Sequence, residues 1–152
     1  MRVRHLLFVI AFTPLSLFAA TDTPVAAVQQ LFDAMKAHDG AAASAVVMPD
    51  ANLLSIRDDG KPVVTPFPQF VEHLTASKAT WLERMWNPTV LQRGAIALVW
   101  AEYDFHLDGK FHHCGVDSVS LVKTADGWKI SGISYTAETT GCAPSPLGPP
   151  TK

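Results

Sequence analysis

The stretch from Gly94 to Lys123, "GAIALVWAEYDFHLDGKFHHCGVDSVSLVK", predicts a long β-hairpin and decides the fold. Two runs rich in β-branched and aromatic residues flank Asp108-Gly109, and such a pair is a strong signal for a two-residue turn. Leu107 then lies opposite Lys110, and the two-residue period of a strand sets every later pair. The pairs expected on one face are His106–Phe111, Asp104–His113, Glu102–Gly115, Trp100–Asp117, Leu98–Val119 and Ile96–Leu121.

The segments around this hairpin complete an α+β domain. Apolar residues at helical spacing follow Thr23, which can cap a helix, and Pro24, which suits its first turn. Pro88 places its strand at an edge or at a bulge. The sequence therefore predicts N-terminal helices packed on one face of an antiparallel sheet. We expect helices at about 24–39, 41–47 and 66–74, a short strand at about 51–57, and strands at about 80–92, 94–107, 110–124 and 127–138.

The first twenty residues have the layout of a secretory signal peptide. A basic start is followed by a short apolar run and by small residues, and we expect cleavage after Ala19 or Ala20. Pro14 and the shortness of the run argue against an uncleaved anchor helix. The expected organisation is a signal peptide at 1–20, one domain at 21–140 and a proline-rich tail at 141–152, in a periplasmic or secreted protein that leaves the membrane after cleavage.

Charge and cysteine content narrow the class of protein further. The formal net charge is −2, and no basic cluster provides a surface for nucleic acid. Cys114 and Cys142 form an even pair, which in an oxidising compartment is more often bridged than free. The alternative is a buried thiol at Cys114 and a free thiol at Cys142.

The last hairpin brings the two cysteines within reach of each other. A four-residue connection at Thr124–Gly127 places Trp128 opposite Lys123. The register then puts Ser134 beside Asp117, Thr136 beside Gly115 and Cys114 beside Ala137, only five residues before Cys142.

One face of the predicted sheet has the composition of a small-molecule pocket. Its base is apolar, and its open end collects Glu102, Asp104, His113, Asp117, Ser134 and Thr136 around the gap at Gly115, beside Trp100. The opposite face carries small apolar residues and is a candidate subunit contact. Tyr103 falls on that opposite face, so we give it no catalytic role.

Acid–base chemistry has two sets of candidates in this pocket. Asp104 opposite His113 would raise the pKa of the imidazole and orient it as a general acid or base. Asp117, beside Trp100 and under the helices, would stay partly protonated because burial disfavours its charge. The structural alternatives are an exposed Asp104–His113 pair and an Asp117 that hydrogen-bonds Ser134.

A metal site is not predicted, because strand alternation separates the potential ligands. His112 and Cys114 point to one face, whereas His106 and His113 point to the other. His106, His113 and Asp104 alone make a poor zinc signature. We expect no metal and no cofactor.

Arg84 and Trp86 share one side of the strand before the hairpin. If this side faces the pocket, Arg84 can neutralise an acid or bind an anionic ligand, Trp86 can form an aromatic wall, and Glu83 lies outside. The alternative is an edge strand with solvated charges.

The chain resembles the NTF2-like superfamily of cone-shaped α+β domains, which includes ketosteroid isomerase, scytalone dehydratase and SnoaL-like cyclases, and especially its exported, uncharacterised members. The resemblance covers about Asp22–Glu138 and rests on "VAAVQQLFDAMKAHDG", "ERMWNP", the hairpin and "DGWKISGISYT". It implies a bent sheet around a long first helix, a pocket at the wide end and commonly a homodimer. The isomerase pattern needs a tyrosine on the first helix, which is absent here, and His113 with Asp117 comes nearest to a dehydratase-like pair.

The function expected from these observations is the binding of a small, partly apolar molecule in the cone, without catalysis. One alternative is a lyase, isomerase or hydrolase that uses His113 with Asp117 or Asp104. Another is a dimerising interaction domain whose cone is filled by core side chains. The expected partners are an unknown small molecule and a second copy of the chain.

Overall fold

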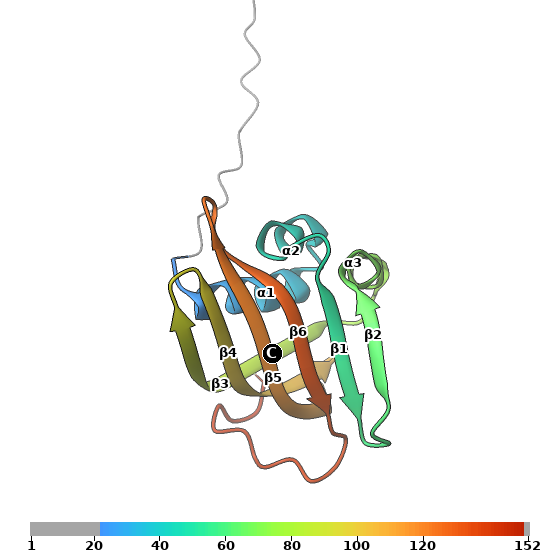
Figure 1. Ribbon diagram of the computed structural model, residues 1–152. Helices are drawn as coiled ribbons and strands as arrows, with labels where there is room; N and C mark the ends of the chain where they lie inside the picture. The colour runs from blue at the N-terminus through green and yellow to red at the C-terminus, as the bar shows by residue number, and fades with distance from the viewer. Residues whose placement is uncertain (1–21, 151–152) are drawn as a thin grey trace, which may run out of the picture.

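A computed structural model describes residues 22–150, in which helix α1 (Pro24–Ala37) lies across one face of a six-stranded sheet (Figure 1). Thr23 caps this helix, because its hydroxyl accepts a hydrogen bond from the backbone N–H of Ala26 (3.1 Å). Pro24 occupies the first turn, where its missing N–H costs nothing. The predicted start of the helix is confirmed.

The remaining elements follow the predicted order, with one strand added. They are α2 (Gly40–Val46), β1 (Asn52–Arg57), β2 (Pro62–Pro66), α3 (Phe67–Ala76), β3 (Trp81–Arg93), β4 (Ile96–Leu107), β5 (Lys110–Thr124) and β6 (Gly127–Ala137). The sheet order is β2-β1-β6-β5-β4-β3 (Figure 1). The α+β class is confirmed.

Two details of the sheet differ from the prediction. The sheet is mixed, because β1 pairs with β6 in parallel. β2 was not predicted, since its five residues begin and end with proline and give only a short extended signal. The predicted signal peptide at 1–20 lies outside the described residues.

The strand that contains Pro88 is an edge strand, as predicted. β3 pairs only with β4 in the described sheet, and its register shifts between Trp86 and Thr89. Asn87 has a φ of 47°, in the left-handed region that asparagine tolerates better than most residues. The irregularity therefore removes the need for a ladder hydrogen bond from Pro88.

The central turn is confirmed, but the register of the hairpin changes three residues later. Asp108 and Gly109 both have positive φ, and Leu107 pairs with Lys110. Phe105 then pairs with His113, so His112 is an extra residue in β5. The prediction that Trp100 lies opposite Asp117 is therefore wrong.

A second bulge shifts β6 in the same way. Leu121 pairs with Ile130 as predicted, but Ser120 pairs with Gly132, which leaves Ser131 as the extra residue. Asp117 consequently lies opposite Tyr135 rather than Ser134.

The bulges explain which face of the hairpin meets the helices. Asp117, Val119 and Leu121 of β5 are buried as predicted, whereas β4 is reversed. Ile96 and Trp100, which we predicted to lie under the helices, are 67% and 51% exposed. The residues of β4 that are buried on the helix side are Ala97, Val99, Ala101, Tyr103 and Phe105. Three of these side chains are small, which allows α1 to approach the sheet closely.

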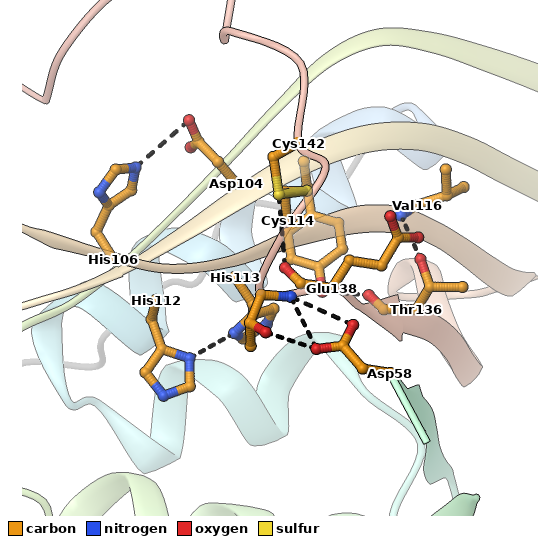
Figure 2. Close-up of a disulfide and its surroundings, with 12 residues drawn as sticks. Asp58, Asp104, His106, His112, His113, Cys114, Val116, Thr136, Glu138 and Cys142 are labelled. Atoms are coloured by element: carbon orange, nitrogen blue, oxygen red, sulfur yellow. Dashed lines mark hydrogen bonds and ion pairs between the residues drawn. A yellow bond between two sulfur atoms is a disulfide. The ribbon is translucent and has the colours of Figure 1, made fainter. Parts of the chain in front are cut away.

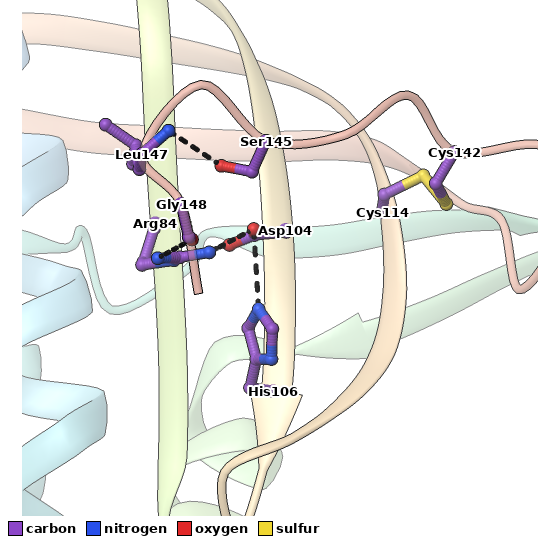
Figure 3. Close-up of polar contacts among 8 residues, drawn as sticks. All are labelled: Arg84, Asp104, His106, Cys114, Cys142, Ser145, Leu147 and Gly148. Atoms are coloured by element: carbon purple, nitrogen blue, oxygen red, sulfur yellow. Dashed lines mark hydrogen bonds and ion pairs between the residues drawn. A yellow bond between two sulfur atoms is a disulfide. The ribbon is translucent and has the colours of Figure 1, made fainter. Parts of the chain in front are cut away.

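A disulfide joins Cys114 to Cys142, with Cα atoms 6.0 Å apart, as predicted (Figure 2). Beyond Cys142 the tail returns to the sheet, and the carbonyl oxygen of Gly148 accepts a hydrogen bond from Nη1 of Arg84 (2.9 Å; Figure 3). Among residues 22–150, none of the helices has the length and apolar character needed to cross a membrane.

Gly115 permits a close approach between β5 and β6. A Cβ at this position would lie 2.2 Å from the carbonyl oxygen of Thr136. That oxygen accepts a hydrogen bond from the Tyr103 hydroxyl (2.6 Å), and the Thr136 hydroxyl accepts one from the N–H of Val116 (3.1 Å). Gly115 therefore serves backbone packing, and the predicted gap in the pocket at this glycine is wrong.

We predict that Gly115→Ala lowers the free energy of unfolding by about 1–3 kcal/mol, because the methyl group collides with backbone that cannot move independently. Gly132→Ala is the matched control, since its Cβ would lie 3.8 Å from the nearest atom, the carbonyl oxygen of Asn52. Urea denaturation of both variants provides the measurement. Equal stabilities for the two variants would contradict this role of Gly115.

Candidate functional site

A cavity of about 540 Å³ lies between the inner face of the sheet and helices α1 and α3. Apolar and aromatic side chains form most of its wall. They are Val28, Leu31, Phe32, Met35, Leu53, Phe70, Trp81, Tyr103, Phe105, Leu107, Val119, Ile133 and Tyr135. This lining and size are typical of a small-molecule pocket.

Two carboxyl groups, those of Glu83 and Asp117, line this cavity. Glu83 comes from β3 and Asp117 from β5, and Tyr103 of the intervening β4 lines the same cavity. Asp117 is 3% exposed, and its Oδ2 has no hydrogen-bond donor among the N–H and hydroxyl groups of residues 22–150. The two carboxyl groups contact each other, so a hydrogen bond between them requires one to keep its proton.

Burial keeps this pair protonated. Burial raises the pKa of Asp117 to about 7, although a hydrogen bond from Glu83 acts in the opposite direction. Burial also raises the pKa of Glu83 well above its usual range, and the charge of Asp117 raises it further. Near neutral pH the pair therefore shares at least one proton, which is the state that a general acid or base needs.

Two phenols lie beside the acids. Burial, followed by the charges of Glu83 and Asp117, raises the pKa of Tyr103, so its hydroxyl stays protonated and donates to Thr136. Burial likewise raises the pKa of Tyr135, which lies opposite Asp117 on β6. The sequence placed Tyr103 on the wrong face because alternation alone does not reveal a bulge.

His113 lines the cavity, and its side-chain partner is His112 rather than an acid. His112 and His113 both lie opposite Phe105, and their Nδ1 atoms are 2.7 Å apart (Figure 2). Burial, and then the charges of His112 and Arg57, lower the pKa of His113 to about 4. Asp117 lies four residues away on the same strand, about 13 Å along the chain. The proposed orientation of His113 by Asp117 or Asp104 is therefore not present.

Asp104 faces the outer side of the sheet, where it pairs with Arg84. Nε and Nη2 of Arg84 donate to its two oxygens (2.8 and 2.5 Å), and Nε2 of His106 lies 3.4 Å from Oδ2 (Figure 3). Burial opposes the charge of Asp104, but the hydrogen bonds from Arg84, together with the neighbouring His106, outweigh it and lower the pKa of Asp104. This cluster belongs to the surface under the C-terminal tail, and not to the cavity.

The other predicted pocket residues also lie outside the cavity. Trp86 donates from Nε1 to the exposed Glu102, and Trp100 is exposed. Ser134 is exposed opposite Ser118, and Thr136 bonds the backbone of Val116. We expected the side of β3 with Arg84 and Trp86 to be the one that could face the pocket. The opposite side of this strand faces the cavity instead and supplies Trp81 and Glu83.

No group of three potential metal ligands occurs within residues 22–150. A second hollow of about 690 Å³ lies between α1 and α2 near Lys129, but alanines and polar side chains line it. The cavity with Glu83 and Asp117 is therefore the candidate site.

These features define a cone-shaped α+β domain with an apolar cavity that contains acids. No family model and no curated protein matches the chain. Solved structures do match, and several of them are described as NTF2-like proteins. An NTF2-like superfamily protein from Salmonella enterica serovar Typhimurium is 14% identical, with a TM-score of 0.59 over 77% of this chain and 89% of that chain.

Two further structures share the fold. A protein of unknown function from Mycobacterium tuberculosis is 14% identical, with a TM-score of 0.64 over 84% of this chain and 74% of that chain. An NTF2-like protein with a cystatin-like fold from Novosphingobium aromaticivorans is 11% identical, with a TM-score of 0.59 over 77% and 80% of the two chains. The chain therefore has the NTF2-like fold, as its sequence indicated.

We predict opposite effects of pH for two Asp→Asn substitutions. The pKa of Asp117 is raised in the folded state, so wild-type stability falls as pH rises from about 4 to 7. This loss of stability is up to about 4 kcal/mol, and Asp117→Asn should not show it. The variant should therefore be more stable than the wild type at pH 8.

Asp104→Asn serves as the comparison. The pKa of Asp104 is lowered, so its contribution is present at pH 7 and disappears as pH falls below about 4. The variant should lose about 1–3 kcal/mol at pH 7, because Arg84 loses its partner. Guanidinium denaturation at pH 4, 6 and 8 measures both effects. If Asp117→Asn is less stable than the wild type at pH 8, the ionised Asp117 does not destabilise the folded protein and the assignment is wrong.

Proposed function

We propose that the protein is exported and binds a small, partly apolar molecule in the cavity of its cone. The observation that carries this proposal is an apolar cavity of about 540 Å³ that core side chains leave open. The carboxyl groups of Glu83 and Asp117 lie in its wall. The Cys114–Cys142 disulfide supports an oxidising compartment. An open cavity also favours binding over the alternative of a filled interaction domain.

We predict that one molecule of Nile red, a neutral apolar dye, binds per chain with an increase in fluorescence. Ile133→Trp should weaken binding at least about 10-fold, because Ile133 lines the cavity and a larger side chain fills it. Ile96→Trp adds the same bulk at a position that is 67% exposed and should bind as wild type does.

Leu53→Phe provides a milder filling of the same cavity if Ile133→Trp does not fold. Circular dichroism and thermal melts establish that each variant is folded. Unchanged dye binding in both folded cavity variants would refute the proposal.

Acid–base catalysis on the bound molecule is a second candidate function. It is favoured by the raised pKa of Asp117, about 7, which lets a carboxyl group exchange protons near neutral pH. In this candidate function the acid–base groups are Asp117 and Glu83. The sequence had suggested His113 with Asp117 or Asp104.

We predict for this second candidate that the protein accelerates α-proton exchange of cyclohexanone in D2O, measured by NMR. Asp117→Asn should lose the acceleration, and Glu102→Gln, which removes an exposed acid on the outer face, should keep it. Equal rates for wild type and Asp117→Asn would eliminate this candidate.

A further inference from the structure

The carboxyl pair of the cavity has no cationic partner in the described part of the chain. Neither Glu83 nor Asp117 forms an ion pair there, whereas Asp104 on the outer face has both Arg84 and His106. Arg84 follows Glu83 in the sequence, but strand alternation turns it to the opposite side of β3. A buried carboxylate without a partner is costly, so these acids retain protons instead.

The basic groups that line the cavity lie away from the pair. Arg57 at the end of β1, His73 on α3 and His112 near the start of β5 are exposed. His113 also lines the cavity, but burial lowers its pKa to about 4, so it is uncharged near neutral pH. They surround the cavity but do not neutralise the acids, because Asp117 Oδ2 remains without a donor. A binding partner for the acids must therefore come with the ligand.

Aromatic rings line the same cavity as the acids and add a second attraction for a cation. The ring of Trp81 lies 5.9 Å from that of Phe105 and 6.1 Å from that of Phe70, and Tyr103 lies 6.4 Å from Tyr135. All five rings line the cavity. The faces of such rings attract ammonium groups, most strongly where water is excluded.

We propose that the natural ligand is an organic amine, with an apolar body that contacts the aromatic wall and an ammonium group that binds the Glu83–Asp117 pair. This inference rests on the proposed binding function and specifies its ligand. The ammonium supplies hydrogen-bond donors to Asp117 Oδ2 and replaces the proton that the acids otherwise share.

Binding should therefore depend on pH in a defined direction. An ammonium needs the carboxylate form of Asp117, which is about 3% populated at pH 5.5 and about 97% at pH 8.5 for a pKa of about 7. Amine affinity should rise about 30-fold between these pH values.

Other titratable groups that line the cavity also contribute to the pH dependence of binding. They are Glu83 on β3, Tyr103 on β4, His112 and His113 on β5, Tyr135 on β6, Arg57 on β1 and His73 on α3. Helix α1 contributes only apolar side chains to the cavity. The pH dependence that remains in Asp117→Asn measures their contribution.

Isothermal titration with a matched pair of probes tests the inference. 4-Phenylbutylamine and 4-phenylbutan-1-ol have the same apolar body, and only the amine carries a charge. At pH 8.5 the amine should bind at least about 10-fold more tightly than the alcohol. Asp117→Asn should abolish this preference, while Glu102→Gln should retain it.

The possible results separate the inference from the proposed function. If the alcohol binds as tightly as the amine, the cavity binds apolar molecules and the inference of an amine is wrong. If neither probe binds but Nile red does, the inference is again wrong and the proposed function stands. If neither probe nor Nile red binds, both fail.

Discussion

Two residues of β5, His112 and His113, lie opposite the single residue Phe105 of β4, and the composition of the cavity depends on this bulge. The extra residue reverses the alternation of β5 relative to β4. His113 and Asp117 consequently share a face with Tyr103, while Trp100 and Asp104 turn outward. Without the bulge, Trp100 instead of Ala101 would lie opposite Asp117, and Glu102 instead of Tyr103 would lie opposite Gly115.

The two aspartates of this hairpin show how surroundings, rather than residue type, determine charge. Asp104 and Asp117 are both almost fully buried, at 4% and 3% exposure. Two hydrogen bonds from Arg84 stabilise the charge of Asp104 and lower its pKa, whereas Asp117 has no cationic partner and burial raises its pKa. The outer face therefore neutralises its acid internally, and the cavity leaves its acids available to a ligand.

The sequence predicts most of the elements but only part of the site. Helix caps, the Asp108-Gly109 turn, the edge position of Pro88 and the disulfide each follow from local chemistry, and all are present. The face of β4 does not follow, because the first half of this strand is apolar on both sides: Leu98 and Trp100 look no less buried in sequence than Val99 and Ala101.

Glu83 was missed for a related reason. The alternation in "WLERMW" is clear, but nothing local shows which side of an edge strand faces a cavity. That choice depends on the opposing helix and on bulges in neighbouring strands, which are tertiary features. The parallel pairing of β1 with β6 is equally non-local, since paired residues such as Leu53 and Ile133 are 80 positions apart in the sequence.

The disulfide lies next to an interruption in the ladder between β5 and β6. The regular pairing of these strands ends at Asp117 and Tyr135, and the Thr136 carbonyl turns to Tyr103 instead of to β5. Pairing resumes at Cys114 and Glu138, where two backbone hydrogen bonds of 3.0 and 2.9 Å form beside the bridge to Cys142. The covalent link holds the strands together beyond the interruption. Tyr103 can therefore take a backbone acceptor from β6, which fixes the phenol beside the acids without separating the strands.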